Sequence, residues 1–287
     1  MALREFARRN GPPHRPQRLK ARRGTRGGPR LGACRLIDVK RLIPQGEPPT
    51  HYRFSGLAAL GLPHITTTRH FPGVSSPSEP TAPFTAQAQH ALRAAGLDPA
   101  RVSYARQVHG AEILQAPRGG GYAGAGDVLT TTERGVPLAI FTADCLAITL
   151  WDTIARVLAV AHVGWRGTVK GVTAAAVRAA VDAGARADQL HVAIAPSIGP
   201  CCYEIDEPVL QAFGRAYGRR AQAWLEPARD AHAMLDLWTA NEALLADAGV
   251  DPRQIENPRL CTACHPDLLY SYRKGNRGRL VTVAALP

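Results

Sequence analysis

The sequence predicts a mixed fold of α-helices and β-strands. The middle of the 287-residue chain is a dense series of short apolar, β-branched segments, which are typical of buried strands. A later stretch places its apolar residues at the spacing of one helix face. After its first 45 residues the chain shows no internal repeat and no change of composition that would mark a second domain. A chain of this length can bury a substantial core, so we expect one large domain.

Strands are predicted where β-branched and apolar runs are bounded by turn residues. In chain order they cover residues 64–70, 102–109, 112–116, 126–132, 138–142, 145–151, 157–162, 190–195, 268–272 and 279–284. The run Gly119–Gly124 matches the GxGxxG pattern of dinucleotide-binding sites, which lies between a strand and a helix. A β-like segment follows the run here, so we interpret it as a glycine-rich loop.

Four helices are predicted, over residues 84–95, 168–183, 206–217 and 236–248. The second has the strongest pattern, because Val169, Val172, Ala176 and Ala180 fall on one helical stripe. Asp206 stands where it can cap the third helix, with a proline in the first turn. Glycines follow the first and last helices and predict where these end.

The positive charge of the chain is concentrated at its N-terminus. The formal net charge is +12, but residues 1–45 hold 13 Lys and Arg against 2 Asp and Glu, a net of +11. The other 242 residues hold 22 against 21, a net of +1. We therefore expect residues 1–45 to be a basic, disordered extension and residues 46–287 to be a single domain. The near-neutral domain lacks an aromatic and basic platform, which argues against nucleic-acid binding through the tail.

Composition also bears on the compartment. No run of 18 apolar residues occurs, and the N-terminus has no apolar segment of the secretory type, so we expect a cytoplasmic protein without membrane contact. Six cysteines are too few for a disulfide scaffold. Cys261–His265 matches the CxxCH haem-attachment pattern, but that chemistry requires export. We expect this pair of cysteines, and Cys201-Cys202, to be structural.

His109, Cys145 and His162 form the most informative set of polar residues. Each lies where a predicted strand meets a turn, so converging strands can bring the three together. Two imidazoles and one thiolate are good zinc ligands, and three protein ligands leave a fourth position for water or substrate. From spacing alone, two buried histidines and a core cysteine remain the favoured interpretation.

Five ordered motifs reverse that preference. The segments 107–110, 142–145 and 162–167 resemble the signature of the YfiH-type laccase-domain family. The match continues with 198–204, and then with 261–262 together with 271–273 and 278–279. The resemblance covers residues 64–285. It implies a four-layer α/β/β/α sandwich similar to the catalytic domain of cytotoxic necrotizing factor. It also implies a purine nucleoside phosphorylase that acts on adenosine, inosine and methylthioadenosine with phosphate, and that deaminates adenosine.

The resemblance implies a zinc ion held by His109, Cys145 and His162. Such an ion would polarise a bound water near neutral pH. Cys145, His162 and Asp144 are then the expected catalytic residues, with Asp144 as general acid or as a partner of the metal site.

The substrate is expected to meet a second set of residues. Gln107 belongs to one of the matching motifs, and Arg69, Arg166 and Arg273 are candidate phosphate ligands because arginine suits bidentate anion contacts. The family's Asn-Leu-Gly stretch is missing, and residues 76–83 stand in its place. The preferred nucleoside is therefore not predicted. The sequence does not predict the oligomeric state either.

Two other chemistries use the same three residues. Copper fits a His₂Cys set, but the only methionines are Met1 and Met234, and no His-x-His pair occurs. We therefore expect no laccase chemistry, and any bound copper to be adventitious. Alternatively, Cys145 is a thiolate nucleophile activated by His162, in a Cys/His amidase of the kind that edits peptidoglycan precursors.

Overall fold

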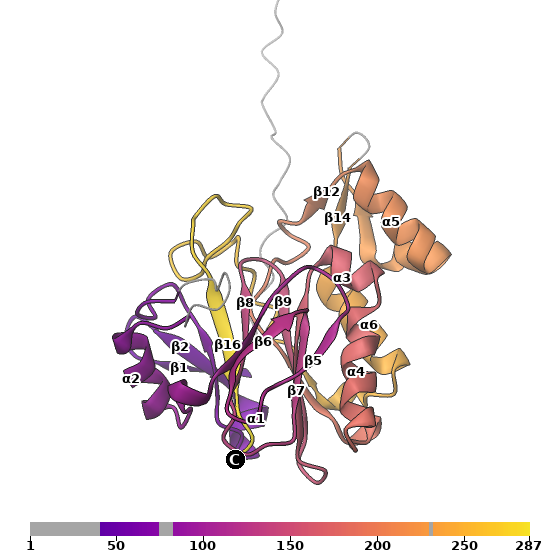
Figure 1. Ribbon diagram of the computed structural model, residues 1–287. Coiled ribbons are helices and arrows are strands. Elements are labelled where there is room, and N and C mark those ends of the chain that lie inside the picture. The colour runs from indigo at the N-terminus through magenta and orange to yellow at the C-terminus, as the bar shows by residue number, and fades with distance from the viewer. Residues whose placement is uncertain (1–40, 75–82, 230–231) are drawn as a thin grey trace, which may run out of the picture. The chain divides into compact units, whose positions relative to one another are not determined.

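The computed structural model describes residues 41–74, 83–229 and 232–287 (Figure 1). Its strands are β1 Leu42–Gln45, β2 His51–Phe54, β3 His64–Thr67, β4 Ser103–Arg106, β5 Ile113–Gln115, β6 Gly121–Ala125, β7 Val128–Thr131, β8 Leu138–Thr142, β9 Leu146–Asp152, β10 Val157–Val163, β11 His191–Ile194, β12 Glu204–Ile205, β13 Leu225–Pro227, β14 Ala233–Leu235, β15 Ile255–Glu256 and β16 Leu280–Ala284. Its helices are α1 Ser55–Ala59, α2 Ala86–Ala94, α3 Trp165–Val169, α4 Val172–Asp182, α5 Glu207–Tyr217 and α6 Leu237–Asp247. Short 3₁₀ helices are η2 Pro99–Arg101, η3 Ala187–Gln189, η4 Gly218–Trp224 and η5 Pro252–Gln254.

A seven-stranded sheet has the order β1-β2-β3-β16-β8-β4-β6. Strand β16, near the end of the chain, lies antiparallel between β3 and β8, with Thr282 opposite both Thr66 and Ile140. Strands β4 and β6 extend the sheet in parallel from β8. The C-terminal segment therefore completes the middle of a sheet whose other strands come from the first half of the chain.

A six-stranded sheet has the order β15-β11-β9-β10-β7-β5. Its centre is the β9–β10 hairpin, in which every residue of both seven-residue strands is buried. Asp152 closes the hairpin by accepting the backbone N–H groups of Ile154 and Ala155. Both faces of this hairpin are covered, which is why its sequence is almost continuously apolar.

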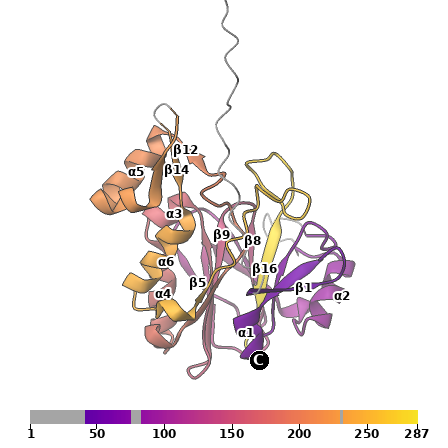
Figure 2. The same cartoon turned by 180° about the vertical axis from the view of Figure 1, so that it is seen from behind.

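Three apolar clusters hold the sheets and helices together. Side chains such as Ile140 of β8 and Leu158 of β10 belong to one cluster that joins the two sheets. The other side of β9 and β10 packs with α4 and α6, where Ala176 and Leu245 are fully buried. The other side of β8 and β16 packs with α2 through Leu92. Figures 1 and 2 show α2 on one side of the sheets and α4 and α6 on the other.

The third sheet is small, with the order β12-β14-β13. It lies against α5, whose Phe213 is fully buried and packs at ring distances of 5.9 and 6.5 Å from Tyr217 and Trp224. Leu235 N–H donates to Tyr203 O at 2.9 Å, which ties this sheet to the loop before β12.

The mixed class with several sheets is confirmed, and most predicted elements appear within a few residues of their expected bounds. The helix predicted over residues 168–183 is two helices, because Gly171 takes a φ of +80° and separates α3 from α4. The strand predicted over residues 268–272 is wrong. There the backbone makes local turns, with Leu268 and Leu269 N–H both donating to His265 O.

Two further local predictions are corrected. The glycine-rich run is not a loop throughout, since Gly121–Ala125 forms β6 beside β4. Asp206 precedes α5 but makes no side-chain capping bond, whereas Asp236 caps α6 by accepting Thr239 N–H at 2.9 Å.

The N-terminal part of the domain was not anticipated. Strands β1 and β2 and helix α1 had no predicted counterpart, and β1 pairs with β2 from Leu42 onward, before the boundary expected at residue 45. Residues 1–40 and 75–82, which include most of the expected tail and of the 76–83 stretch, lie outside the described residues. Within the described ranges, none of the helices has the length and apolar character required to cross a bilayer.

Candidate active site

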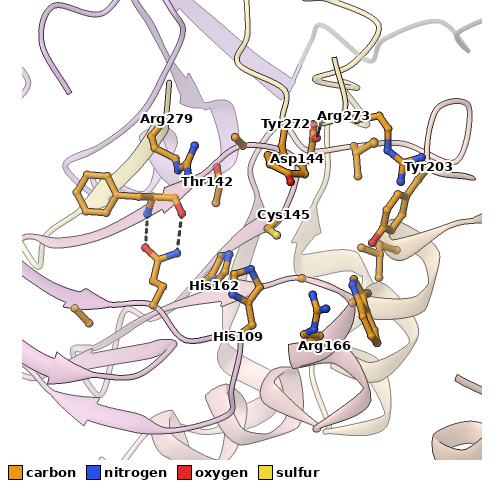
Figure 3. Close-up of a pocket in the computed structure, with 18 of the residues that line it drawn as sticks. His109, Thr142, Asp144, Cys145, His162, Arg166, Tyr203, Tyr272, Arg273 and Arg279 are labelled. Carbon is orange, nitrogen blue, oxygen red and sulfur yellow. Dashed lines mark hydrogen bonds between the residues drawn. The ribbon is translucent and has the colours of Figure 1, made fainter. Parts of the chain in front are cut away.

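A cavity of about 520 Å³ opens where β4, β8 and β10 end and α3 begins (Figure 3). Its wall also includes the loop that carries Tyr203 and the loop that carries Tyr272, Arg273 and Arg279. His109, Cys145 and His162 all line it, as do Asp144, Gln107 and Arg166. The structure therefore gathers most of the predicted site residues around one cavity.

His109, Cys145 and His162 offer ligand atoms that all lie within 4.8 Å of one another. The register of the β9–β10 hairpin explains part of this, because His162 lies opposite Ala147, close to the start of β9 and thus to Cys145. His109 comes from the loop after β4, and its ring centroid is 4.7 Å from that of His162. Figure 3 shows the two rings beside each other below the Cys145 sulfur.

Asp127 fixes both histidines, although the sequence analysis did not select it. Its buried carboxylate accepts the backbone N–H groups of Val108, His109 and Gly110 at 3.1, 3.0 and 2.7 Å. These bonds hold the loop in which His109 takes a φ of +56°. The same carboxylate lies 2.7 Å from His162 Nδ1, which leaves Nε2 of that ring to face Cys145. A lone acidic residue before a fully buried strand was the signal that could have found it.

In the metal-free chain, neighbouring groups shift the pKa values of Cys145, His162 and Asp127. Burial raises the pKa of the Cys145 thiol, but the imidazoles of His109 and His162 more than compensate and lower it to about 6. Burial lowers the pKa of His162, but Asp127 and Cys145 raise it to about 9. Burial also opposes ionisation of Asp127, yet His162 and the backbone N–H groups keep its pKa below the ordinary value. The cysteine is therefore a thiolate near neutral pH.

Gly164 allows the turn after β10 to pass close to the sulfur. A Cβ atom at this position would lie 2.9 Å from Cys145 Sγ and 3.4 Å from His109 Cδ2. A side chain there would have to displace the sulfur or the ring. The glycine in the His162–Gly167 motif is therefore required by the packing of the site.

Asp144 lies beside Cys145 with a φ of +89°, and both of its carboxylate oxygens are engaged. Oδ1 accepts the Thr262 hydroxyl at 2.6 Å, and Oδ2 accepts the Arg273 backbone N–H at 2.8 Å. Its backbone carbonyl accepts Ile198 N–H at 2.9 Å. Asp144 thus joins the loop after β8 to two loops that come from the last third of the chain.

Four arginines reach the cavity from three segments of the chain: Arg106, Arg166, and Arg273 with Arg279. The Arg166 guanidinium stacks over the Trp165 ring at 4.4 Å. That of Arg273 lies 5.4 Å from the Tyr203 ring centroid and donates to Glu204 O at 2.8 Å. Arg106 and Arg279 were not selected as site residues, although Arg279 belongs to one of the matching motifs.

The other two predicted contacts are placed differently. Gln107 lines the cavity, but its side-chain amide pairs with β8, donating to Phe141 O at 2.7 Å and accepting Phe141 N–H at 2.8 Å. Arg69 is not among the described residues that line the cavity. Its guanidinium donates to Pro266 O at 2.6 Å and lies over the Tyr270 ring.

Several known proteins are similar to this chain. A family model described as multi-copper polyphenol oxidoreductase laccase matches residues 79–287. A purine nucleoside phosphorylase from Deinococcus radiodurans is 36% identical over 239 residues, which are 79% of this chain and 90% of that protein. Adenosine deaminase RL5, from an unknown prokaryotic organism, is 35% identical over 158 residues, 54% of this chain and 60% of that protein.

The solved structures agree with these matches. The crystal structure of YlmD from Geobacillus stearothermophilus aligns with a TM-score of 0.75 and 26% identity, covering 85% of this chain and 99% of that one. The length of the relatives varies, since the match spans only 34% of the human purine nucleoside phosphorylase LACC1. The relatives that share the sequence motifs and the fold thus include proteins named as purine nucleoside phosphorylases and as an adenosine deaminase.

Proposed function

Because the chain belongs to the multi-copper polyphenol oxidoreductase laccase family, of the YfiH type, we propose that it is a zinc-dependent purine nucleoside phosphorylase. Its proposed substrates are adenosine, inosine and methylthioadenosine together with phosphate, and adenosine deamination is a second activity at the same cavity. The observation that carries the proposal is the convergence of His109, Cys145 and His162 on the wall of the cavity, with Asp127 behind them.

The donor set fits zinc better than copper. A thiolate and two imidazoles are borderline ligands of the kind that Zn²⁺ takes, and the cavity beside them leaves room for a fourth ligand. Asp127 supplies the carboxylate–histidine contact that orients metal-ligating imidazoles. The only methionine in the described residues, Met234, lies in β14 and is not among the residues that line the cavity, so the set lacks the axial ligand of blue-copper sites.

The residues of the chain suit phosphorolysis of a nucleoside. In that reaction a phosphate oxygen bonds to ribose C1′ while the C1′–N9 bond breaks and the purine leaves. The guanidinium groups of Arg166, Arg273 and Arg279 would hold the phosphate dianion and aim it at C1′. The 82% exposed ring of Tyr272 offers an apolar face to the purine at the mouth of the cavity.

A Zn²⁺ held by His109, Cys145 and His162 would supply Lewis acidity at the wall of the cavity. Asp144 would act there as a positioning residue, because its two oxygens already hold Thr262 and Arg273. Its role as a proton donor remains a prediction, as do the phosphate contact of Arg69 and the substrate contact of Gln107. We also propose a four-layer α/β/β/α arrangement, supported by the three apolar clusters, and a reducing, cytoplasmic setting that keeps Cys145 as a thiolate.

The test is metal analysis of the purified protein together with product analysis. Adenosine with phosphate should give adenine and ribose-1-phosphate, and adenosine without phosphate should give inosine. Removal of the metal should abolish both reactions, and Zn²⁺ should restore them. A metal-free protein that is fully active on nucleosides would overturn the role of zinc, and the absence of all these products would overturn the proposed substrates.

A second candidate function rests on the contacts of the Cys145 sulfur. It lies within 4.8 Å of ligand atoms of both imidazoles, which lower the pKa of its thiol to about 6, while the pKa of His162 is raised to about 9. This arrangement suits a Cys/His amidase. His109→Ala separates the two candidates, because zinc chemistry needs this ligand, whereas a Cys145–His162 pair keeps its nucleophile and base without it.

A further inference from the structure

A second sulfur cluster lies outside the active site, on two loops that the topology brings together. Cys201 and Cys202 follow β11, and Cys261 and Cys264 follow β15. Ser197 N–H donates to Leu260 O at 3.2 Å, and Thr262 N–H donates to Ser197 O at 3.1 Å. These bonds continue the parallel pairing of β11 and β15 beyond the ends of both strands, and they set the two cysteine pairs face to face.

The four sulfurs have the spacing of a metal site. All four Sγ atoms lie within 4.8 Å of one another. The distance from Cys264 Sγ is 3.4 Å to Cys201 Sγ and 3.5 Å to Cys202 Sγ. Four sulfurs at about 2.3 Å from a tetrahedral zinc ion are separated by about 3.8 Å. The cluster therefore needs only a small expansion to accept an ion at its centre.

One backbone donor from the opposite loop points at the Cys261 sulfur. Gly199 N–H donates to Cys261 Sγ at 3.2 Å. An N–H group that donates to a sulfur favours its charged form, which is the form that binds metal ions. This is an observation independent of the distances between the sulfurs.

We propose that Cys201, Cys202, Cys261 and Cys264 bind a zinc ion as a closed site with four sulfur ligands. Four thiolates fill the tetrahedral coordination of zinc and leave no position for substrate, so the site is structural. The four thiolates and Zn²⁺ carry a net charge of −2, which the Gly199 N–H and the nearby Lys274 ammonium partly offset.

Binding requires the reduced form of Cys264, which is disulfide-bonded in this structure. A phosphine reductant supplies the electrons: the S–S bond takes up two electrons and two protons and yields two thiols. The phosphine takes the oxygen of water and becomes a phosphine oxide. Zinc then displaces the protons of the four thiols as it binds. The proposal therefore concerns the chain in a reducing environment.

We expect zinc bound to the four cysteines to hold together two loops that line the active-site cavity. Ile198 and Tyr203, which line the cavity, flank the first cysteine pair. Thr262, between the second pair, donates to Asp144 Oδ1 at 2.6 Å. A metal ion between the pairs would thus hold the part of the wall that Asp144 joins to Cys145.

The experiment measures zinc in the full chain after reduction with a phosphine and removal of excess metal. The unaltered chain should hold two zinc ions, Cys145→Ala one, Cys261→Ser one, and the double variant none. Cobalt added to zinc-depleted Cys145→Ala should give the intense thiolate-to-cobalt absorption of a tetrahedral four-sulfur site. If Cys145→Ala binds no metal after reduction, the proposal is overturned, whether or not the active site proves to use zinc.

Thiol alkylation gives a second measurement that does not depend on the folding of the Cys261→Ser variant. In reduced Cys145→Ala, bound zinc should slow alkylation of Cys201, Cys202, Cys261 and Cys264 by at least tenfold, and a chelator should reverse the protection. Equal alkylation rates with and without zinc would contradict the proposal.

Discussion

The two clusters of candidate metal ligands in this chain differ in how many ligands the protein supplies. The three ligand atoms of His109, Cys145 and His162 face a cavity of about 520 Å³, and Asp127 supports them from behind. The four cysteines at positions 201, 202, 261 and 264 bring four sulfurs within 4.8 Å of one another, which once reduced would be a full ligand set for the proposed zinc ion. An open set leaves a position for chemistry, whereas a closed set can only hold structure. Both clusters contain cysteine, so cysteine alone does not distinguish a reactive site from a structural one. The number of protein ligands and the free space beside them make that distinction.

The largest expected effect comes from removing the sulfur of the open site. Cys145→Ala should lose the metal of this site and lower nucleoside turnover by about 10³-fold or more, because two imidazoles alone hold zinc weakly. The measurement is kcat with adenosine and phosphate beside the zinc content. Cys264→Ala is the matched control and should keep the metal of the open site and most of the turnover. Equal losses in the two variants would remove the distinction between the clusters.

His64 is a buried histidine outside the open site, and both of its ring nitrogens bond to backbone groups. Its Nδ1 donates to Leu62 O at 2.8 Å, and its Nε2 accepts Phe54 N–H at 2.7 Å, so the ring is neutral in the folded chain. Burial lowers the pKa of His64 to about 4, from an ordinary value of 6.5.

Protonation of His64 should therefore destabilise the fold in acid. Its contribution is fully present above pH 6.5 and is lost as the pH falls toward 4, because the unfolded chain then binds a proton that the folded chain does not. The loss is about 3 kcal/mol in the free energy of unfolding. Denaturant unfolding between pH 7 and 4 should show this loss, and His64→Gln should flatten the profile. An unchanged profile in the variant would assign the acid sensitivity to other groups.

Asp127→Asn tests whether the carboxylate behind the histidines contributes to metal binding at the open site. The amide keeps the shape of the carboxylate but loses its charge, so the His162 ring is held less firmly. Zinc affinity of the open site should fall 10–100-fold, as measured by competition with a chelator.

Asp152→Asn is the control for this variant, because Asp152 is also a buried carboxylate that accepts backbone N–H groups, at Ile154, Ala155 and Arg186. It should lower stability without changing zinc affinity. A similar loss of affinity in both variants would mean that Asp127 acts only through the stability of the fold.

A smaller effect is expected from Gly164→Ala. The added methyl group would meet Cys145 Sγ at 2.9 Å, so the sulfur must shift by a few tenths of an ångström and zinc affinity should fall about tenfold or less. Gly214→Ala, in α5 with no atom near the new Cβ, should instead raise the free energy of unfolding by up to about 1 kcal/mol. Titration with zinc and denaturant unfolding of both variants would check these outcomes.

The local pattern of the sequence was enough to predict most of the elements. Strands such as β8, β9 and β10 form because their apolar and β-branched runs are buried in a sheet, and α6 ends just before the glycine at 249 that was expected to stop it. The failures were also local in origin. One glycine at 171 divides a helix, and hydrogen bonds to His265 turn residues 268–269 away from any strand.

The site itself required tertiary structure. Motifs indicated His109, Cys145 and His162, but no spacing in the sequence showed that Asp127 would hold two of them, or that Asp144 would be occupied by Thr262 and Arg273. These contacts join residues separated by up to 129 positions. They arise because β16 enters between β3 and β8 and because β11 pairs with β15, arrangements that depend on the packing of whole sheets. Residue types carry the chemistry, whereas the order of strands decides which of those residues meet.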